Sequence, residues 1–364
     1  MKITKKNIFI CIIVALLAVA SVYLGVQYAK LSQITTLDDD IMSILDEPPM
    51  KGKMNLLLLG VDEGGNRSDT IMVVSVDNVK KDVKLLSIPR DTKITLNNGK
   101  SVKINALIGF PQREEIVIET IKTITKMPIH YYCEVDFGGF MEIIDILGGV
   151  NYDVPFDMDY DDPVQDLHIH LKKGLQHLDG KEAHDFVRFR HNNKGSAVYA
   201  PGDYYKGDIG RIGAQQAFLT ELFRQKMQPQ YILKAPELLT AASKYVQSNF
   251  TISSALEFVS MLKSTDTNEL KTFILPGEGR YINNVSYYIY SPSETKKLVL
   301  EEFGYPEGEA KKLAEKPSAT TSPSSTPAAS TTPASTTAGE NKNVASPAPS
   351  ATPVATRKPA EEID

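Results

Sequence analysis

The chain opens with a long apolar run behind three lysines. Lys2, Lys5 and Lys6 precede Ile8–Val26, a run of about 19 residues with no charged side chain. A run of this length can span the hydrocarbon core of a bilayer, and lysines favour the cytoplasmic side. We therefore expect residues 1–6 in the cytoplasm, a transmembrane anchor over 7–29 and the remaining chain outside the cell. A cleaved signal peptide is the alternative, but its apolar region is normally shorter, and no small-x-small cleavage site follows this one.

The pattern changes twice before regular structure begins. Residues 30–52 have no sustained period and carry the acidic cluster Asp38–Asp40, which is typical of an extracellular stalk. From Asn55 onward, short runs rich in Val, Ile and Leu alternate with charged turns, a pattern that predicts buried strands. The predicted order is strands at Asn55–Val61, Ile71–Asp77 and Val83–Ile88, a helix at Glu114–Thr125, a strand at Tyr131–Asp136, a helix at Phe137–Leu147 and a strand at Val150–Val154.

Helical signals dominate the second half of the domain. Asp179 and Glu182 have the spacing of a capping box, which predicts a short helix leading into Val187. Ser291, with proline next and glutamate at the third position, predicts the start of a last helix. Further helices are expected at Gln215–Lys226, Pro236–Tyr245 and Ser253–Leu262, and a strand at Thr272–Leu275. Strands that alternate with helices predict a layered α/β domain.

Composition limits the class of protein. After about Pro306 the chain is mostly Ala, Ser, Thr and Pro, so residues 306–364 are predicted to form a disordered tail. Cys11 lies inside the expected membrane span and Cys133 in a predicted strand outside it, so the two cannot pair and a disulfide framework is excluded. The net charge of −5 argues against a general nucleic-acid binder. About 250 residues between anchor and tail are ample for an ordinary hydrophobic core.

Charged residues follow the apolar runs in four short segments. Arginine forks match phosphate oxygens, and paired carboxylates can hold a magnesium ion that bridges phosphates. A site that collects both kinds of charge indicates a polyanionic, metal-bound substrate such as a pyrophosphate. The segments are Gly60-Val-Asp62 with Arg67-Ser-Asp69, Ser87-Ile-Pro-Arg90-Asp91, Arg188-Phe-Arg190, and Asp208-Ile-Gly-Arg211 with Gln215.

Two of these segments also have an ordinary structural explanation, and the other two have the geometry of an anion site. Asp62 and Asp69 can be turn residues that accept hydrogen bonds from their own backbone, and Arg90 with Asp91 can be a surface ion pair. Arg188 and Arg190 would share one face of an extended segment and form a phosphate clamp. Arg211 and Gln215, four residues apart, would share one face at the start of a helix, where anions bind readily.

Other candidate chemistry is weaker. His168 and His170 alternate along a predicted strand and can pair on a metal ion, but a solvated strand face is the favoured interpretation. The sequence contains no HExxH, GxSxG, Walker or CxxC motif.

Taken in order, these segments resemble the LytR–CpsA–Psr family. The resemblance covers roughly Lys53–Phe303, so the catalytic domain is expected over residues 53–305. The ordered set is specific, although each piece alone is weak. The matching stretches include Asn55-Leu-Leu-Leu-Leu-Gly-Val-Asp62, Arg67-Ser-Asp-Thr70, Leu86-Ser-Ile-Pro-Arg-Asp-Thr92, Val187-Arg-Phe-Arg-His191 and Asp208-Ile-Gly-Arg211.

The resemblance implies a fold and an activity. The fold is a three-layer α/β/α sandwich with a central mixed sheet, whose core holds a polyprenyl chain. The activity is a membrane-anchored phosphotransferase of Gram-positive bacteria. It moves a glycopolymer, such as teichoic acid or capsular polysaccharide, from an undecaprenyl-pyrophosphate carrier to peptidoglycan through a phosphodiester bond.

The resemblance also implies roles for individual residues. Asp62 and Asp69 would hold Mg²⁺. The acceptor hydroxyl would lose its proton to Asp91 or Asp69, between which the sequence does not decide. The pyrophosphate would be bound by Arg67, Arg90, Arg188, Arg190, Arg211 and Gln215, with Arg90, Asp91, Arg188 and Arg190 as the catalytic group.

Two departures from the family keep other functions open. Ala214 stands where the family usually has a second arginine, and the loop from His191 to Asp208, with Tyr199, Tyr204 and Tyr205, is longer than the common form. One alternative is a pyrophosphatase that cleaves the lipid-linked glycan with water as the acceptor. Another is a non-catalytic scaffold that binds polyprenyl phosphates.

Overall fold

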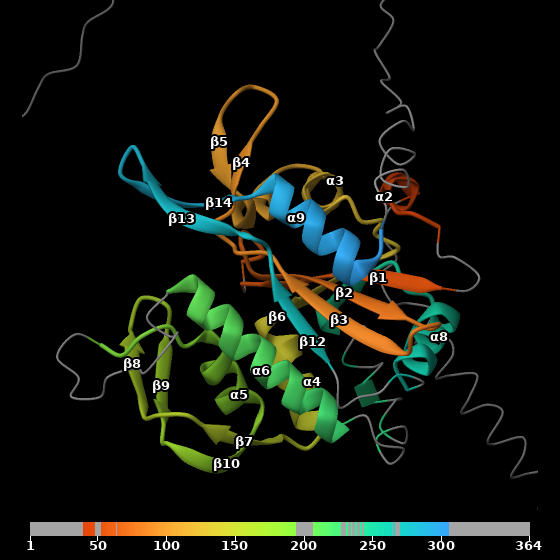
Figure 1. Ribbon diagram of the computed structural model, residues 1–364. Helices are drawn as coiled ribbons and strands as arrows, with labels where there is room; N and C mark the ends of the chain where they lie inside the picture. Colours follow the sequence, from red (N-terminus) through yellow and green to blue (C-terminus); the bar gives the residue numbers. More distant parts are fainter. Residues whose placement is uncertain are drawn as a thin grey trace, which may run out of the picture. The chain divides into compact units, whose positions relative to one another are not determined.

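A six-stranded mixed sheet organises the domain (Figure 1). β1 is antiparallel to β2 and β2 to β3, whereas β6 runs parallel to β1 and β12 parallel to β3. The predicted mixed α/β fold with a central mixed sheet is therefore confirmed. In sheet order the strands are β11 (Val246–Ser248), β6 (Tyr131–Asp136), β1 (Lys53–Val61), β2 (Ser68–Asp77), β3 (Asp82–Ser87) and β12 (Lys271–Ile274).

The computed structural model describes residues 39–47, 52–62, 64–193, 207–226, 246–263 and 270–305, with a few further positions between 231 and 265. The predicted anchor (7–29) and tail (306–364) lie outside these residues. Within the described ranges, no helix is long and apolar enough to cross a membrane. Part of the predicted stalk forms α2 (Asp39–Ile44), and just after it Leu45 is buried in the core of the domain.

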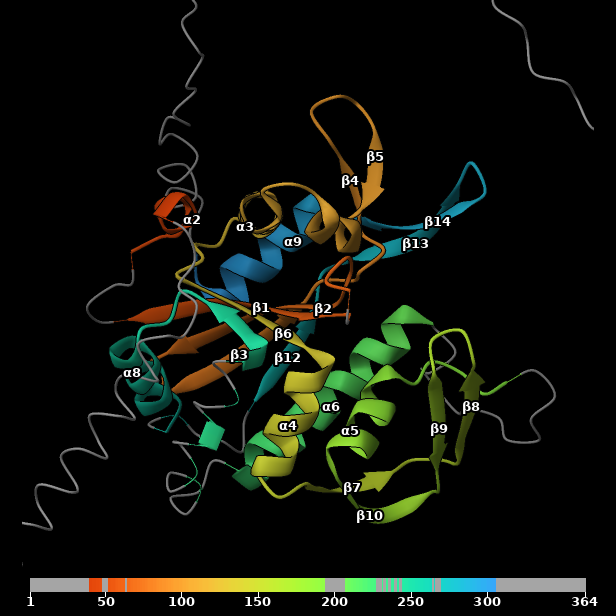
Figure 2. The same ribbon diagram turned by 180° about the vertical axis from the view of Figure 1, so that it is seen from behind.

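Both faces of the sheet are buried, because alternate residues of its strands are apolar on each side. From β1, Leu57 and Leu59 pack on the face covered by α3 (Arg113–Thr125) and α9 (Pro292–Leu298). Met54 and Leu56 point to the other face and pack with Phe258 and Met261 of α8 (Ile252–Lys263). Figures 1 and 2 show helices on both sides of the sheet.

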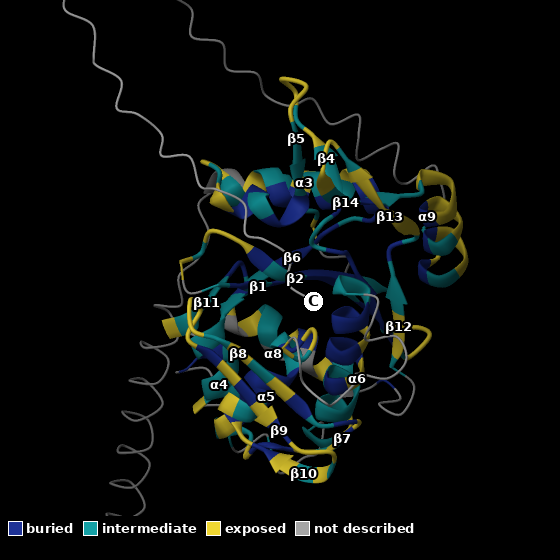
Figure 3. Cartoon of the chain, turned by 90° about the vertical axis from the view of Figure 1, so that its left-hand side faces the viewer, coloured by how far each residue is buried: buried dark blue, intermediate teal, exposed yellow. Residues whose placement is uncertain are grey.

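The long helix α6 (Asp208–Lys226) lies against the same face as α8, and its Gln216 side chain helps to fix it to the sheet. Gln216 is 7 % exposed, and its amide donates to Ser87 Oγ and to the Phe273 carbonyl, both at 2.8 Å. Figure 3 shows buried residues gathered along α6 and in β1 and β2.

A small lobe completes that side of the domain. It contains α4 (Phe137–Ile146), α5 (Gly180–Arg188) and two hairpin-like pairs packed around Phe186, Phe189 and Phe218. In β9, Leu167, Ile169 and Leu171 point inward, while His168 and His170 are exposed, as the solvated-face interpretation predicted. The paired strands are β7 (Val150–Val154) with β10 (Gly174–Leu178), and β8 (Met158–Asp162) with β9 (Leu167–Leu171).

The local sequence signals identified helix ends correctly. Asp179 forms the predicted capping box with Glu182 at the start of α5, and Ser291 caps α9. Gly148 and Gly149 follow α4 with φ of 75° and 64°, the left-handed backbone that glycine adopts without strain.

Some elements differ from the prediction. α6 begins at Asp208, seven residues before the predicted start. The prediction was late because Gly210 and Gly213 interrupt the apolar pattern in the first turns of the helix. The predicted helix Pro236–Tyr245 falls on a segment that is only partly described. Two further hairpins were not predicted, because their strands lack a clear apolar alternation. They are β4 (Lys93–Thr95) with β5 (Ser101–Lys103), and β13 (Gly277–Ile282) with β14 (Val285–Tyr290).

His130 holds the start of β6 against β1. Its Nδ1 accepts a hydrogen bond from the Asn55 backbone N–H at 2.9 Å, and its own backbone N–H donates to the Asn55 carbonyl. Burial lowers the pKa of His130 to about 4, with nearby Lys122 acting in the same direction and Asp46 against it. The imidazole must therefore be neutral in the folded protein at physiological pH.

We expect the domain to lose stability as pH falls from 7 to 5. The unfolded chain gains a proton on His130 near pH 6.5, whereas the folded chain does not until about pH 4. Through this residue alone, the free energy of unfolding should fall by about 2 kcal/mol between pH 7 and pH 5. His130→Asn keeps an acceptor but cannot titrate. Denaturant unfolding at both pH values should show a smaller loss in the variant, and an equal loss in both proteins would contradict this assignment.

Candidate functional site

The charged segments converge because of the strand directions. β1 ends at Val61, opposite Ser68 at the start of β2, and β3 ends at Ser87, opposite Met72. Asp62, Asp69 and Arg90 therefore emerge from one edge of the sheet. β6 runs parallel to β1 and ends at the same edge, where α4 begins. In open α/β sheets, ligands bind at this carboxyl edge of the parallel strands.

Two arginines and two aspartates form an ion network at this edge. Arg90 Nη1 donates to Asp69 Oδ1 at 2.5 Å, and Arg90 Nε lies 3.4 Å from Asp208 Oδ1. Arg211 Nη2 donates to Asp208 Oδ1 at 2.7 Å and to the Asp69 carbonyl at 2.9 Å. The Arg90 backbone N–H donates to Asp208 Oδ2. The network thus joins β2, the segment after β3 and the first turn of α6.

Burial disfavours the charged forms of the side chains in this network, so their opposite charges must stabilise one another. The Arg211 side chain is 3 % exposed, and that burial lowers its pKa, opposed by Asp208 and Asp69 and reinforced by Arg90 and Arg190. Burial alone would raise the pKa of Asp69, but the charges of Arg211 and Arg90 outweigh it and hold that pKa below the usual range. Asp69 is therefore ionised, and both guanidinium groups stay charged.

Arg188 and Arg190 add positive charge beside the network. Arg188 ends α5, stacks over the Phe137 ring at 4.6 Å from its centroid, and donates to Gln165 Oε1 at 2.9 Å. Its charge contributes to the lowered pKa of Asp69, as that of Arg190 does for Arg211. Phe189 is buried between them, and both arginines lie close enough to the network for their charges to act on it.

Several buried polar atoms around the network have no hydrogen-bond partner among the described residues. They include Arg211 Nε, Ser68 Oγ and Gln215 Oε1. Gln215 does use its amide nitrogen, which donates to the Val187 carbonyl and links α6 to α5. Because buried polar atoms are normally paired, a group of unpaired ones indicates a place that a ligand or water completes.

The two carboxylates predicted to hold magnesium lie on neighbouring segments. Asp62 Oδ1 accepts hydrogen bonds from the backbone N–H groups of Asn66 and Arg67, as the side chain of a turn residue does. Asp69 Oδ1 is occupied by Arg90. Within the described residues, Oδ2 of each carboxylate makes no hydrogen bond or ion pair. Carboxylate oxygens are the ligands that Mg²⁺ prefers, so each carboxylate has one oxygen that such an ion could use.

The other predicted site residues lie at the edge of the network. Asp91 forms an ion pair with Lys103 Nζ at 2.8 Å, and its backbone carbonyl accepts from Tyr288. Arg67 is exposed in the turn after β1. Ala214 is buried in the apolar cluster of the lobe. Asp69 pairs with Arg90 and Asp208 pairs with Arg211, so neither carboxylate needs an arginine at position 214 as its partner. Tyr199, Tyr204 and Tyr205 lie outside the described residues.

Sequence reasoning underestimated Asp208. Its carboxylate bridges Arg90 and Arg211, yet no role was assigned to it. The available signal was its spacing of three residues before Arg211, which places both side chains on one face of a helix. Phe137 and Gln165, which orient Arg188, gave no signal of their own.

Comparison with known proteins identifies the family. Residues 22–302 match the LytR_cpsA_psr family. The chain is 31% identical over 254 residues to the polyisoprenyl-teichoic acid–peptidoglycan teichoic acid transferase TagV of Bacillus subtilis (strain 168), covering 67% of this chain and 62% of that relative. It therefore spans less than two thirds of TagV. The transferase TagU of Bacillus cereus (strain ATCC 14579) is 32% identical over 248 residues, covering 67% of this chain and 75% of TagU.

Solved structures agree with this assignment. The crystal structure of B. subtilis TagV matches with a TM-score of 0.57 at 30% identity, covering 71% of this chain and all of that one. B. subtilis TagT, at 20% identity, shares the fold with a TM-score of 0.53 over 74% of this chain and 92% of TagT. The family match, these relatives and the shared mixed α/β fold show that this chain belongs to the LytR–CpsA–Psr family.

Proposed function

We propose that this protein is a membrane-anchored phosphotransferase of the bacterial cell wall. It moves an anionic glycopolymer of the teichoic acid class from an undecaprenyl-pyrophosphate carrier to peptidoglycan, with a phosphodiester bond as the product. The anchor over residues 7–29 holds the catalytic domain outside the cell, where peptidoglycan is found. Family membership and the names of TagV and TagU support the reaction class.

The observation that carries the proposal is the excess of guanidinium groups at one edge of the sheet. Arg90 and Arg211 are neutralised by Asp69 and Asp208, whereas Arg188 and Arg190 face the same place with no carboxylate partner among the described residues. Such an arrangement binds a pyrophosphate and stabilises the charge that grows on the leaving lipid phosphate. Arg67 and Gln215 are the further proposed contacts.

Magnesium is the proposed cofactor. Asp62 and Asp69 would hold it, since each has a carboxylate oxygen that is not committed to another group. When bound, Mg²⁺ would withdraw negative charge from the phosphates. Arg90, hydrogen-bonded to Asp69, would orient the same phosphates from the protein side.

We propose Asp91 as the group that accepts the proton of the acceptor hydroxyl. Asp69 is the alternative, but Arg211 and Arg90 hold its pKa below the usual range and make it a weak base. Asp91 follows Arg90 directly, and Lys103 fixes the orientation of its carboxylate.

Arg90→Ala and Arg188→Ala should each lower transfer by about 10²–10³-fold, the usual loss when one transition-state donor is removed. The assay supplies the full-length protein with a lipid-pyrophosphate glycan and peptidoglycan oligomers, and counts glycan linked to peptidoglycan. Arg280→Ala is the matched control, because Arg280 is an exposed arginine on β13. Unchanged transfer in both site variants, with normal thermal unfolding, would exclude the proposed site.

The products of the same assay separate the alternative functions. A lipid monophosphate released without linked glycan would indicate a pyrophosphatase. Tight binding of the lipid with neither product would indicate a scaffold.

Removing magnesium should abolish transfer. EDTA should stop the reaction and added Mg²⁺ should restore it, because the pyrophosphate loses its main counter-charge. Asp62→Asn should raise the Mg²⁺ concentration needed for half-maximal rate, since one ligand oxygen loses its charge. Full activity in EDTA would contradict the metal assignment and leave the arginine site standing.

Asp91→Asn should lower the turnover number by about 10²–10⁴-fold, the typical contribution of a general base. Binding of the lipid-linked donor should change little, since the Asp91 carboxylate pairs with Lys103 and has no hydrogen to donate to the phosphates. A larger loss in donor binding than in turnover would contradict the role of base.

A further inference from the structure

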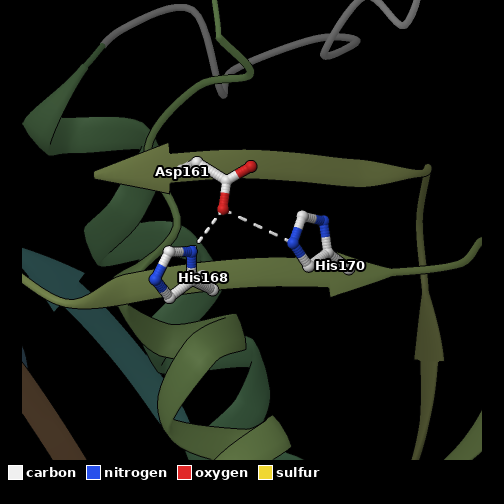
Figure 4. A group of neighbouring side chains, drawn as sticks. All are labelled: Asp161, His168 and His170. Carbon is white, nitrogen blue, oxygen red and sulfur yellow. Dashed lines mark hydrogen bonds and ion pairs between the residues drawn. The ribbon is translucent and has the colours of Figure 1, made fainter. Parts of the chain in front are cut away.

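The strand pair β8–β9 carries a group of potential metal ligands on its exposed face (Figure 4). Asp161 on β8 lies directly opposite His168 on β9, and Asp159 lies opposite His170. All four side chains are on the solvent face, with 47–62 % of each side chain exposed. One ligand atom each from Asp161, His168 and His170 can be chosen so that all lie within 4.8 Å of one another.

The contacts within this group already resemble a metal site. Asp161 Oδ1 lies 2.5 Å from His168 Nδ1 and 3.5 Å from His170 Nε2. Tetrahedral zinc, with bonds of 2.0–2.1 Å, places its ligand atoms about 3.3 Å apart. Replacing the proton between Asp161 and His168 by a metal ion therefore needs only small side-chain rotations.

A second carboxylate orients one of the histidines. His170 Nδ1 lies 2.8 Å from Asp159 Oδ1, so Asp159 accepts the Nδ1 proton and leaves Nε2 as the free ring nitrogen on the side of Asp161. A carboxylate behind a ligating histidine is the usual outer partner in zinc sites. Asp166 Oδ1, 3.5 Å from His168 Nε2, has the same relation to the other histidine.

We propose that Asp161, His168 and His170 bind a divalent transition-metal ion, with Zn²⁺ as the best match, and that Asp159 orients His170. Two imidazoles and one carboxylate suit zinc and disfavour Mg²⁺ and Ca²⁺, which prefer oxygen ligands. Three protein ligands leave one position for water. The ion pairs of an ordinary solvated strand face are the competing explanation of the same contacts.

The location gives the ion a structural role. At the β8–β9 turn, Gln165 receives a hydrogen bond from Arg188 and donates to Asp162 Oδ2. Along the other edge of β8, Asn192 and Asn193 bind its backbone. The Asp159 N–H donates to Asn192 Oδ1 at 2.7 Å, and the Asp161 N–H donates to Asn193 Oδ1 at 2.6 Å. A metal ion that fixes β8 against β9 would therefore also fix the segment that carries Arg188 and Arg190.

The test is zinc binding by the full-length protein, measured by calorimetry with Zn²⁺ alone. We expect one ion per chain, affinity at least tenfold weaker for the double variant His168→Gln/His170→Gln, and about 10–100-fold weaker for Asp159→Asn. His177→Gln is the control, because His177 is an exposed histidine on β10 outside the group. Excess Mg²⁺ should not displace the zinc.

Hydrogen exchange tests the structural role without any glycan substrate, so its outcome is independent of the proposed transferase activity. Zinc should slow exchange of the Asp159 and Asp161 amides and of the Asn193 amide, which donates to the Asp159 carbonyl. No binding, or binding that the double variant retains, would overturn the metal site. Binding without added protection at these amides would overturn the link to Arg188 and Arg190.

Discussion

Mutual neutralisation of Asp69, Asp208, Arg90 and Arg211 is the interaction on which the site depends. A guanidinium as buried as that of Arg211 is tolerated only when carboxylates and carbonyls satisfy it, and removing one partner of such a pair typically costs about 3–5 kcal/mol. The four groups come from β2, from the segment after β3 and from α6. The same contacts therefore assemble the site and hold the helix to the sheet edge.

The mixed sheet explains how distant segments reach one place. Because β2 is antiparallel to both neighbours, its first residues meet the last residues of β1 and β3. The parallel strand β6 then delivers Phe137 to the same edge, where it supports Arg188. These strand directions thus bring residues more than a hundred positions apart into contact.

Sequence reasoning captured the features that depend on local periodicity and on residue type. The buried strands, α3, α4 and the caps of α5 and α9 follow from apolar spacing and capping residues. Arginines and aspartates at strand ends were recognised as a charged site. Which arginine pairs with which aspartate could not be predicted, because the register of β1, β2 and β3 and the packing of α6 decide it. The apolar pattern gave too late a start for α6, because Gly210 and Gly213 interrupt that pattern in its first turns.

The anchoring of α6 by Gln216 has a consequence for how related enzymes can diverge. Its two hydrogen bonds to β3 and β12 lie little more than one helical turn from Arg211, so that end of the helix cannot slide or rotate independently of the sheet. Arg90 and Arg211 thus belong to the half of the site that is fixed to the sheet. Arg188 and Arg190 belong to the other half, borne on a lobe with its own apolar cluster. Changes in that lobe can therefore move Arg188 and Arg190 while Arg90 and Arg211 keep their geometry.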